Sequence, residues 1–188
     1  MFIEQCPLRK HLQEITEKDV SEHERLLEAL RLKIPHSIEV VLFEEREGMQ
    51  VSDFMCYEFA FDLYNFREYK NILERLPWRI NPIGADKKFV IFFLRNNSLE
   101  EIQIKRDGDF IIYFEKNQPT HAGKLTKNRI RSKWGKGLIL EHEIDEVPEL
   151  YGNEVKYYKS ISSEDLIDLF ISYAEEEHGI EFQELSDQ

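Results

Sequence analysis

The chain has 188 residues and a formal net charge of −12, from 37 acidic and 25 basic side chains. Its hydrophobic content of 41% is enough to bury one sizeable core, so we expect a single domain over residues 1–188. The excess of carboxylates repels phosphate groups, which argues against nonspecific binding to nucleic acid.

The sequence also lacks a candidate for a targeting or membrane segment. The first residues include Glu4 and Pro7 and contain neither a basic region nor an apolar run of signal-peptide type. No apolar run approaches the ~20 residues that cross a bilayer. Two cysteines, Cys6 and Cys56, are too few for a disulfide framework and are expected to be thiols. The sequence therefore predicts a soluble, cytoplasmic protein with no membrane partner.

The first elements along the chain are predicted to be a helix and a strand. The run "SEHERLLEALRL" (21–32) has leucines at helical spacing, and Pro35 ends that segment. The run "SIEVVLF" (37–43) alternates as a strand does, and Gly48 ends it.

Two further helices are predicted between residues 50 and 100. The run "SDFMCYEFAFDLYNFREY" (52–69) opens with N-cap residues and carries apolar side chains at helical spacing. Cys56 therefore lies in a first helical turn. The run "KKFVIFFLRNN" (87–97) fits a helix, and its dense apolar residues would also suit a strand.

From residue 100 onward the pattern changes to short alternating runs separated by glycines and a proline, which is typical of an antiparallel meander. The expected strands are "EEIQI" (100–104), "RDGDFIIYF" (106–114), "HAGKL" (121–125), "NRIRS" (128–132), "GLILEH" (137–142) and "EVKYYK" (154–159). A last helix is predicted to begin at Ser162 or Ser163 and to end at Gly179, with a solvated acidic tail.

These elements predict an α+β fold with N-terminal helices packed on a central antiparallel sheet. Within the single domain, residues 1–47 are expected to form a helical and strand extension, and residues 48–160 the core. Residues 161–188 are expected to form the C-terminal helix and the acidic tail.

Cys56 is the first candidate for chemistry. A thiol in the first turn of a helix faces unpaired backbone N–H groups and the positive end of the helix dipole, which favour the thiolate. The same N–H groups can stabilise an oxyanion. The other interpretation is structural, because Cys56 shares a helical stripe with Phe59, Ala60 and Leu63, and cysteine is among the most buried residue types.

The order of a helix-borne cysteine followed by a strand-borne histidine then resembles a known family. The segments "CYEFAFDL", "GDFIIYF" and "THAG" are similar to those of papain-like cysteine hydrolases of the NlpC and CHAP type. In these proteins a cysteine opens a helix that packs on an antiparallel sheet, and a His-x-Gly step carries the base. The resemblance covers roughly residues 50–160 and implies a papain-like core.

The resemblance also implies roles for individual residues. Cys56 would be the nucleophile, His121 the general base facing the Cys56 sulfur at hydrogen-bond range or slightly beyond, and His142 the third member that orients His121. Gln50, upstream of the cysteine, would donate a hydrogen bond to the oxyanion or to the substrate.

The third position of this arrangement stays open at the level of sequence. Glu141, Glu143 and Asp145 lie beside His142, and any of them could face the base instead. Strand alternation places His142 on one face and its two flanking carboxylates on the other.

A basic run lies in the same region of this acidic chain, and it comprises Lys124, Lys127, Arg129, Arg131, Lys133 and Lys136. It is either an ordinary solvated strand face or a source of positive potential that favours the thiolate and attracts carboxylate-bearing substrates. We expect Lys133 and Trp134 to contact the substrate. Nucleic acid is not an expected partner, because Trp134 is the only aromatic residue within the run.

Two functions remain. The first is a cysteine peptidase or amidase that uses Cys56, His121 and His142 on a peptide or protein substrate with an amide bond. The second is a noncatalytic acidic binding protein, of inhibitor or immunity type, that pairs with a basic protein. We expect neither a cofactor nor a metal site, because the sequence has no zinc-ligand spacing and no phosphate-binding glycine loop. The oligomeric state stays open.

Overall fold

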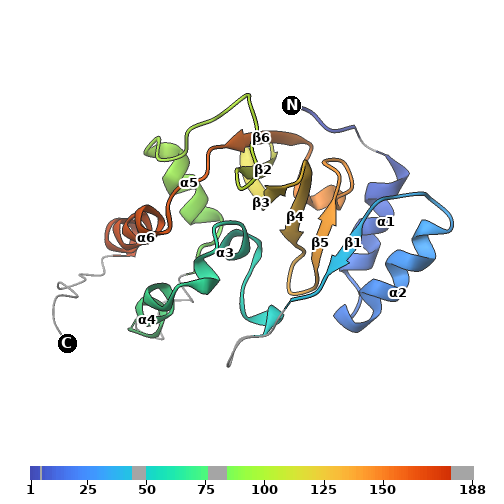
Figure 1. The fold of residues 1–188 in the computed structure, drawn as a ribbon, viewed down its shortest axis with the longest axis horizontal. Helices are drawn as coiled ribbons and strands as arrows, with labels where there is room; N and C mark the ends of the chain where they lie inside the picture. Colours follow the sequence, from blue (N-terminus) through green and yellow to red (C-terminus); the bar gives the residue numbers. More distant parts are fainter. Residues whose placement is uncertain (5, 44–49, 76–83, 179–188) are drawn as a thin grey trace.

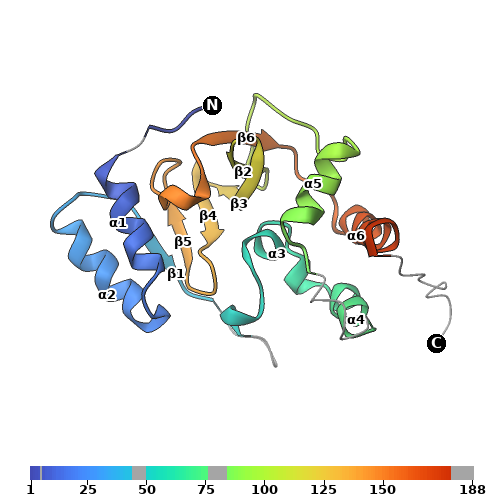
Figure 2. The same ribbon diagram turned by 180° about the vertical axis from the view of Figure 1, so that it is seen from behind.

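The structure, a computed structural model, describes residues 1–4, 6–43, 50–75 and 84–178. In this part of the chain a six-stranded sheet separates two groups of helices (Figure 1). Helices α1 and α2 lie on one side and α3 to α6 on the other, and the view from behind shows the same arrangement (Figure 2). Each strand pairs with its neighbours in antiparallel orientation. The predicted α+β class and antiparallel sheet are therefore confirmed.

The helices are α1 Pro7–Thr16, α2 Val20–Arg31, α3 Cys56–Ala60, α4 Arg67–Arg75, α5 Lys87–Arg95 and α6 Ser163–His178, with short 3₁₀ turns η1 Val51–Asp53, η2 Leu63–Asn65 and η3 Glu149–Tyr151. The strands are β1 Glu39–Val41, β2 Phe110–Glu115, β3 Gln118–Thr126, β4 Arg129–Lys133, β5 Ile139–His142 and β6 Glu154–Tyr158. The predicted helix at 87–97 is thus confirmed over its strand alternative, and so are those at 21–32 and near 163.

The strand order is β1-β5-β4-β3-β2-β6, so β6 lies beside β2 and not beside β5. Two-residue turns at Lys116–Asn117 and Lys127–Asn128 join β2 to β3 and β3 to β4, and all four residues have positive φ. Such turns match the twist of a hairpin. The predicted strand at 100–104 is wrong, because it contributes a single bridge from Glu101 to Tyr158.

The predicted helix at 52–69 is divided in the structure. Met55 is extended, α3 begins at Cys56, and Asp62 follows α3 in the left-handed region with φ of 56°. The Asp62 carboxylate pairs with Lys124 on β3, a contact that helical periodicity cannot register. The break leaves Cys56 as the first residue of its helix, so the prediction that it lies in a first turn is confirmed.

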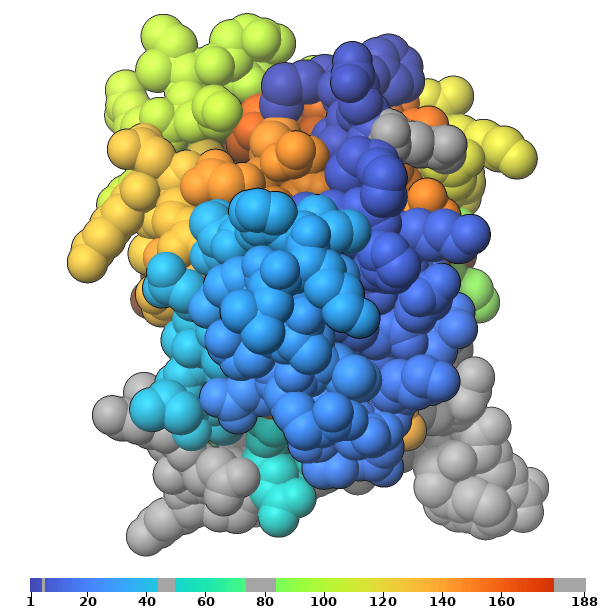
Figure 3. Space-filling model, turned by 90° about the vertical axis from the view of Figure 1, so that its right-hand side faces the viewer, coloured from blue at the N-terminus to red at the C-terminus, as the bar shows by residue number. Residues whose placement is uncertain are grey.

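The sheet is covered on both faces. Along β2, Phe110 and Ile112 face α3 to α6, whereas Ile111 and Tyr113 face α1 and α2. Helices α1 and α2 cover one end of the molecule as a continuous surface (Figure 3). A strand that is buried on both faces reads as a continuous apolar run, as "FIIYF" does.

The segment at 1–47 contributes to this sheet and to its cover. Strand β1 pairs with β5 at the edge of the sheet. The buried Arg9 guanidinium on α1 donates hydrogen bonds to the carbonyl oxygens of Val147, Pro148 and Gly152. Burial lowers the pKa of Arg9. These bonds fix α1 against the loop that carries η3.

Some sequence predictions lie outside the described residues, namely the breaks at Gly48 and Gly179 and most of the acidic tail. Among the helices of the described residues, none combines the length and the apolar content that a bilayer crossing requires.

Candidate functional site

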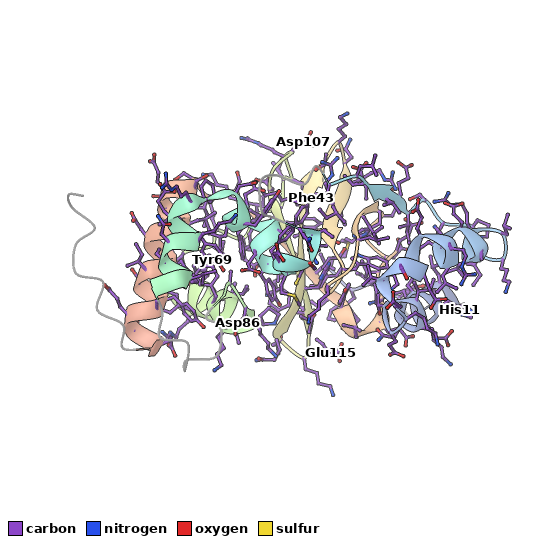
Figure 4. All side chains as sticks on the ribbon, turned by 90° about the horizontal axis from the view of Figure 1, so that it is seen from below. His11, Phe43, Tyr69, Asp86, Asp107 and Glu115 are labelled. Carbon is purple, nitrogen blue, oxygen red and sulfur yellow. The ribbon has the colours of Figure 1, made fainter. Side chains whose placement is uncertain are left out.

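A cavity of about 540 Å³ lies beside the start of α3. Its walls include Cys56 and Tyr57 of α3, Leu73 of α4, Ala85 just before α5, and Thr120 of β3. Figure 4 labels Tyr69 on α4 and Asp86 at the N-cap of α5, at the end of the molecule away from α1. The surface of the cavity is mostly apolar. The volume is within the ~300–1,000 Å³ range of small-molecule sites.

Cys56 lies where β3 and β4 stop pairing. Their last paired residues are Gly123 and Ser132, and the backbone N–H of Ala122, one residue beyond, faces the Cys56 sulfur. The backbone N–H groups of Tyr57 and of Cys56 itself also face this sulfur. Cys56 packs against the apolar cluster on the face of the sheet that α3 to α6 cover.

Burial nevertheless governs the protonation of this thiol. The three backbone N–H groups and the Lys133 ammonium each lower the pKa of Cys56, but burial outweighs them and raises it to about 11. The predicted groups that favour the thiolate are present, but burial outweighs them, so the resting Cys56 is a thiol. Neither Cys56 nor Cys6 forms a disulfide.

Lys133 is the cation of this site. It ends β4, is completely buried, and donates a hydrogen bond of 2.6 Å to the carbonyl of Gly135, with its ammonium 5.4 Å from the ring centre of Phe54. Burial lowers the pKa of Lys133 to about 8, against the raising effects of Cys56 and Glu58. The predicted contact of Lys133 with the substrate is therefore not supported, because its ammonium is buried and Lys133 does not line the cavity.

Glu58 and Tyr69 hold the start of α3. The Glu58 carboxylate accepts hydrogen bonds of 2.7 Å from the Met55 N–H and from the Tyr69 hydroxyl, which in turn accepts one from the Ala85 N–H. Burial raises the pKa of Glu58. This network ties the N-terminus of α3 to α4 and to the residue before α5. It was missed at the level of sequence, although a glutamate three residues into a helix is a known capping signal.

His121 is also completely buried, one residue before Ala122 on β3. Its ring stacks on Tyr151 with centroids 3.8 Å apart, and neither ring nitrogen has a hydrogen-bond partner among the described residues. Burial, and then His142, lower the pKa of His121 well below its usual value. A buried imidazole without partners is costly, and such exceptions mark strained or functional positions.

The predicted hydrogen bond between Cys56 and His121 does not form in the structure. The register pairs His121 with Tyr113, on the face that α1 and α2 cover, whereas α3 packs on the other face. Tyr151, on which the His121 ring stacks, lies within electrostatic range of the Cys56 thiol, which is the second cause, after burial, of the raised pKa of Tyr151. Lys133 acts on the thiol from the face that α3 covers, and His121 lies on the opposite face.

His142 does not orient His121. Its Nδ1 bonds to the Glu143 carbonyl at 2.7 Å, and its Nε2 bonds to the Ser132 hydroxyl at 2.8 Å. Both nitrogens are engaged elsewhere, so the predicted third role of His142 is wrong. Glu141 projects from the opposite face of β5 and pairs with Arg131, which agrees with the predicted alternation.

Two further predicted contacts with the substrate are not supported. Gln50 is exposed and caps η1, where its N–H donates to the Asp53 carboxylate at 2.7 Å, and it does not line the cavity. Trp134 is 3% exposed and donates a hydrogen bond from its indole N–H to Ser132. Trp134 therefore belongs to the core beneath α1 and α2.

The basic run is largely neutralised from within the protein. Lys124 pairs with Asp62, and the Arg129 guanidinium contacts the carboxylates of Glu39, Glu141 and Glu143. These partners come from three separate segments of the chain. Four of the six basic side chains are thus paired or buried.

In the described ranges no group of three histidine, cysteine, aspartate or glutamate side chains is arranged to hold a metal ion. Tyr57 and Tyr151 are neighbours of Cys56 that the sequence did not indicate. Tyr57 directly follows the cysteine, so its position near Cys56 was predictable from the sequence. Tyr151 is distant in sequence and is brought near Cys56 by tertiary packing alone.

Comparison with known proteins gives one family match. A family model described as Domain of unknown function (DUF7689) matches residues 85–159, which run from the cavity wall through α5 to β6. The matched segment contains His121 and Lys133, and Cys56 lies outside it. No curated protein matches the chain, and no solved structure matches it either.

Proposed function

We propose that this protein is a cysteine-dependent hydrolase that cleaves an amide bond, with Cys56 as the nucleophile. One observation carries the proposal: Cys56 begins α3 on the wall of a cavity, where the backbone N–H groups of Ala122, Tyr57 and Cys56 favour negative charge on its sulfur. Such N–H groups stabilise the oxyanion that forms when a carbonyl is attacked.

His121 is the proposed general base. Its nitrogens have no other partner, and its residue directly precedes the one whose N–H faces the sulfur. The His121 ring lies on the face of the sheet opposite α3, so the proposed role requires the ring to come within hydrogen-bond range of the thiol when substrate binds. The raised pKa of Cys56 and the lowered pKa of His121 favour a neutral pair at rest.

The reaction then follows from these protonation states. As the sulfur attacks the carbonyl carbon, the thiol proton moves to a ring nitrogen of His121, and the oxyanion faces the backbone N–H groups. Cleavage of the C–N bond gives a thioester on Cys56, and the imidazolium returns the proton to the amine. Water activated by His121 hydrolyses the thioester and restores the thiol. Lys133 is the proposed positioning cation that favours negative charge on the sulfur.

The test uses p-nitrophenyl butyrate, an activated acyl ester, on the full chain and on matched variants. We expect acylation of Cys56 but not of Cys6, detected by mass spectrometry as a thioester that hydroxylamine removes. Cys56→Ala should abolish p-nitrophenol release above background, and His121→Asn should lower it by ~100-fold or more, the usual contribution of a general base. Cys6→Ala and His142→Gln are the controls and should retain the rate.

Circular dichroism of each variant shows whether a loss of activity comes from the removed side chain or from unfolding of the protein. Equal acylation of Cys6 and Cys56, or release that Cys56→Ala leaves unchanged, would exclude the proposal.

The noncatalytic acidic binding protein is the second candidate. Two observations favour it, namely the thiol pKa of about 11 and the net charge of −12. A protonated thiol is a weak nucleophile, and the acidic balance suits a basic protein partner. If Cys56 is not acylated in the folded protein, this candidate is preferred, and Cys56 is then an apolar packing residue of α3.

A further inference from the structure

Tyr57 presents an unexplained polar group beside the cavity. Its side chain is 5% exposed and is one of the cavity's lining residues. The hydroxyl is buried and has no hydrogen-bond partner in the part of the chain that the structure describes. A buried hydroxyl without a partner loses its hydrogen bonds to water and gains none, which costs ~1–3 kcal/mol.

The neighbours of Tyr57 indicate where its hydroxyl lies. Burial raises the pKa of Tyr57, and the next largest causes are Cys56 and Asp86, which also line the cavity. The hydroxyl therefore stays protonated at neutral pH and lies within electrostatic range of both groups. It is a donor held at the cavity wall.

Three other polar side chains at or near the cavity, those of Glu58, Tyr69 and Thr120, have hydrogen-bond partners. Glu58 and Tyr69 bond to each other and to two backbone N–H groups. The Thr120 hydroxyl bonds to the carbonyls of Tyr113 and Tyr151. The Tyr57 hydroxyl differs from these groups, because none of the described residues accepts its hydrogen bond. A ligand in the cavity would supply that acceptor.

We infer that the cavity binds a largely apolar, uncharged group that carries one hydrogen-bond acceptor, and that the acceptor bonds to the Tyr57 hydroxyl. The apolar character follows from the cavity surface, with Met55, Leu73 and Ala85 among its lining residues. Asp53, Glu58 and Asp86 line the same cavity together with Lys87, and the excess of carboxylates over the one ammonium disfavours an anion. The identification of this group as the acyl part of the substrate rests on the hydrolase function proposed above.

Binding is measured in the Cys56→Ala protein, so that the result is independent of thiol chemistry. The probes are propiophenone, which has a carbonyl acceptor, and n-propylbenzene, which has the same apolar frame without it. Titration followed by amide NMR locates the ligand from the shifts of Leu73 and Ala85. We expect both probes to shift these amides, with propiophenone binding more tightly.

Tyr57→Phe in this background should raise the Kd of propiophenone by about fivefold, the effect of one net hydrogen bond, and leave that of n-propylbenzene unchanged. Tyr157→Phe is the matched control, because the Tyr157 hydroxyl on β6 accepts a hydrogen bond from Lys105 and does not line the cavity. This variant should change the Kd of neither probe. The anion 3-phenylpropanoate should bind more weakly than propiophenone.

The inference is overturned if neither probe shifts the cavity amides, if Tyr57→Phe affects both neutral probes equally or not at all, or if the anion binds as tightly as the ketone. A failure of ester hydrolysis with these binding results intact would remove the hydrolase function and leave the ligand site.

Discussion

Acidification from pH 8 to pH 5 should destabilise this protein through His142. Burial lowers the pKa of His142 from 6.5 to about 4. The unfolded chain therefore binds a proton at pH 5 that the folded chain does not, so the free energy of unfolding falls as the pH drops below 6.5. With these two pKa values the loss at pH 5 is about 2 kcal/mol, and it approaches about 3 kcal/mol below pH 4.

The hydrogen bonds of His142 explain why its neutral form is preferred. The Trp134 indole can only donate, so the Ser132 oxygen accepts from it and the Ser132 proton points to His142 Nε2. His142 Nδ1 donates to the Glu143 carbonyl. A proton on Nε2 would face the Ser132 hydroxyl proton, and the pair would have to reorganise inside the core.

The assay is urea unfolding at a series of pH values between 8 and 5, in the wild type and in His142→Gln. The variant should show a shallower dependence on pH. His121 contributes in the same direction as His142 and Glu58 in the opposite one. Glu58 cancels in the comparison, and His121 cancels except for the smaller part of its lowered pKa that His142 causes. NMR titration of the wild-type imidazoles gives the pKa directly. Parallel profiles for wild type and His142→Gln, or titration of His142 near 6.5, would refute the reasoning.

Two matched pairs of variants test the packing around the cavity and the sheet by urea unfolding. Tyr69→Phe removes a hydroxyl with two buried partners and should lower the free energy of unfolding by about 2 kcal/mol. Tyr57→Phe removes a hydroxyl without partners and should leave the free energy of unfolding unchanged. Equal losses in the two variants would contradict the hydrogen bonds described. Gly152→Ala should cost about 3 kcal/mol or more, because φ is +91° and the new Cβ would lie 2.2 Å from a backbone oxygen. Gly108→Ala has φ of +90° with open space around it, so only the backbone cost of about 1 kcal/mol is expected, and a similar loss at both glycines would argue against the close contact.

The strands were predictable because their signal is local. Strand β2 is buried on both faces, and its continuous apolar run marks it without knowledge of its partners. Strand order was not predictable, since the position of β6 beside β2 depends on pairing between residues more than 40 positions apart, such as Phe110 and Tyr158. The division of the 52–69 segment was hidden for the same reason, because its break at Asp62 accompanies an ion pair with a distant lysine.

The candidate site shows the same limit in its chemistry. The first-turn position of Cys56 was predicted, but the predicted N-cap at Ser52 or Asp53 is wrong, because both residues lie in η1 and Met55 is the N-cap of α3. The pKa of Cys56 was not predictable, because the N–H groups and Lys133 favour the thiolate while burial by distant segments disfavours it, and only the folded structure shows which effect is larger. His142 is not among the proposed catalytic residues, because both of its ring nitrogens bond to other residues, Ser132 and Glu143. The contact with Ser132 depends on the register of β4 and β5, which the sequence does not show.

The balance of these pKa values also decides which reagent reports on the site. At pH 7 the Lys133 ammonium is charged, because its pKa is about 8, and the Cys56 thiol is protonated, because its pKa is about 11. Fast alkylation by iodoacetamide at mildly acidic pH requires a thiolate that this site does not hold at rest. In the mechanism proposed above an acyl ester differs, since its oxyanion would form beside the backbone N–H groups while the thiol proton is transferred to His121. The proton transfer and the attack are then one step, and acylation of Cys56 with slow alkylation is the combination that the structure favours.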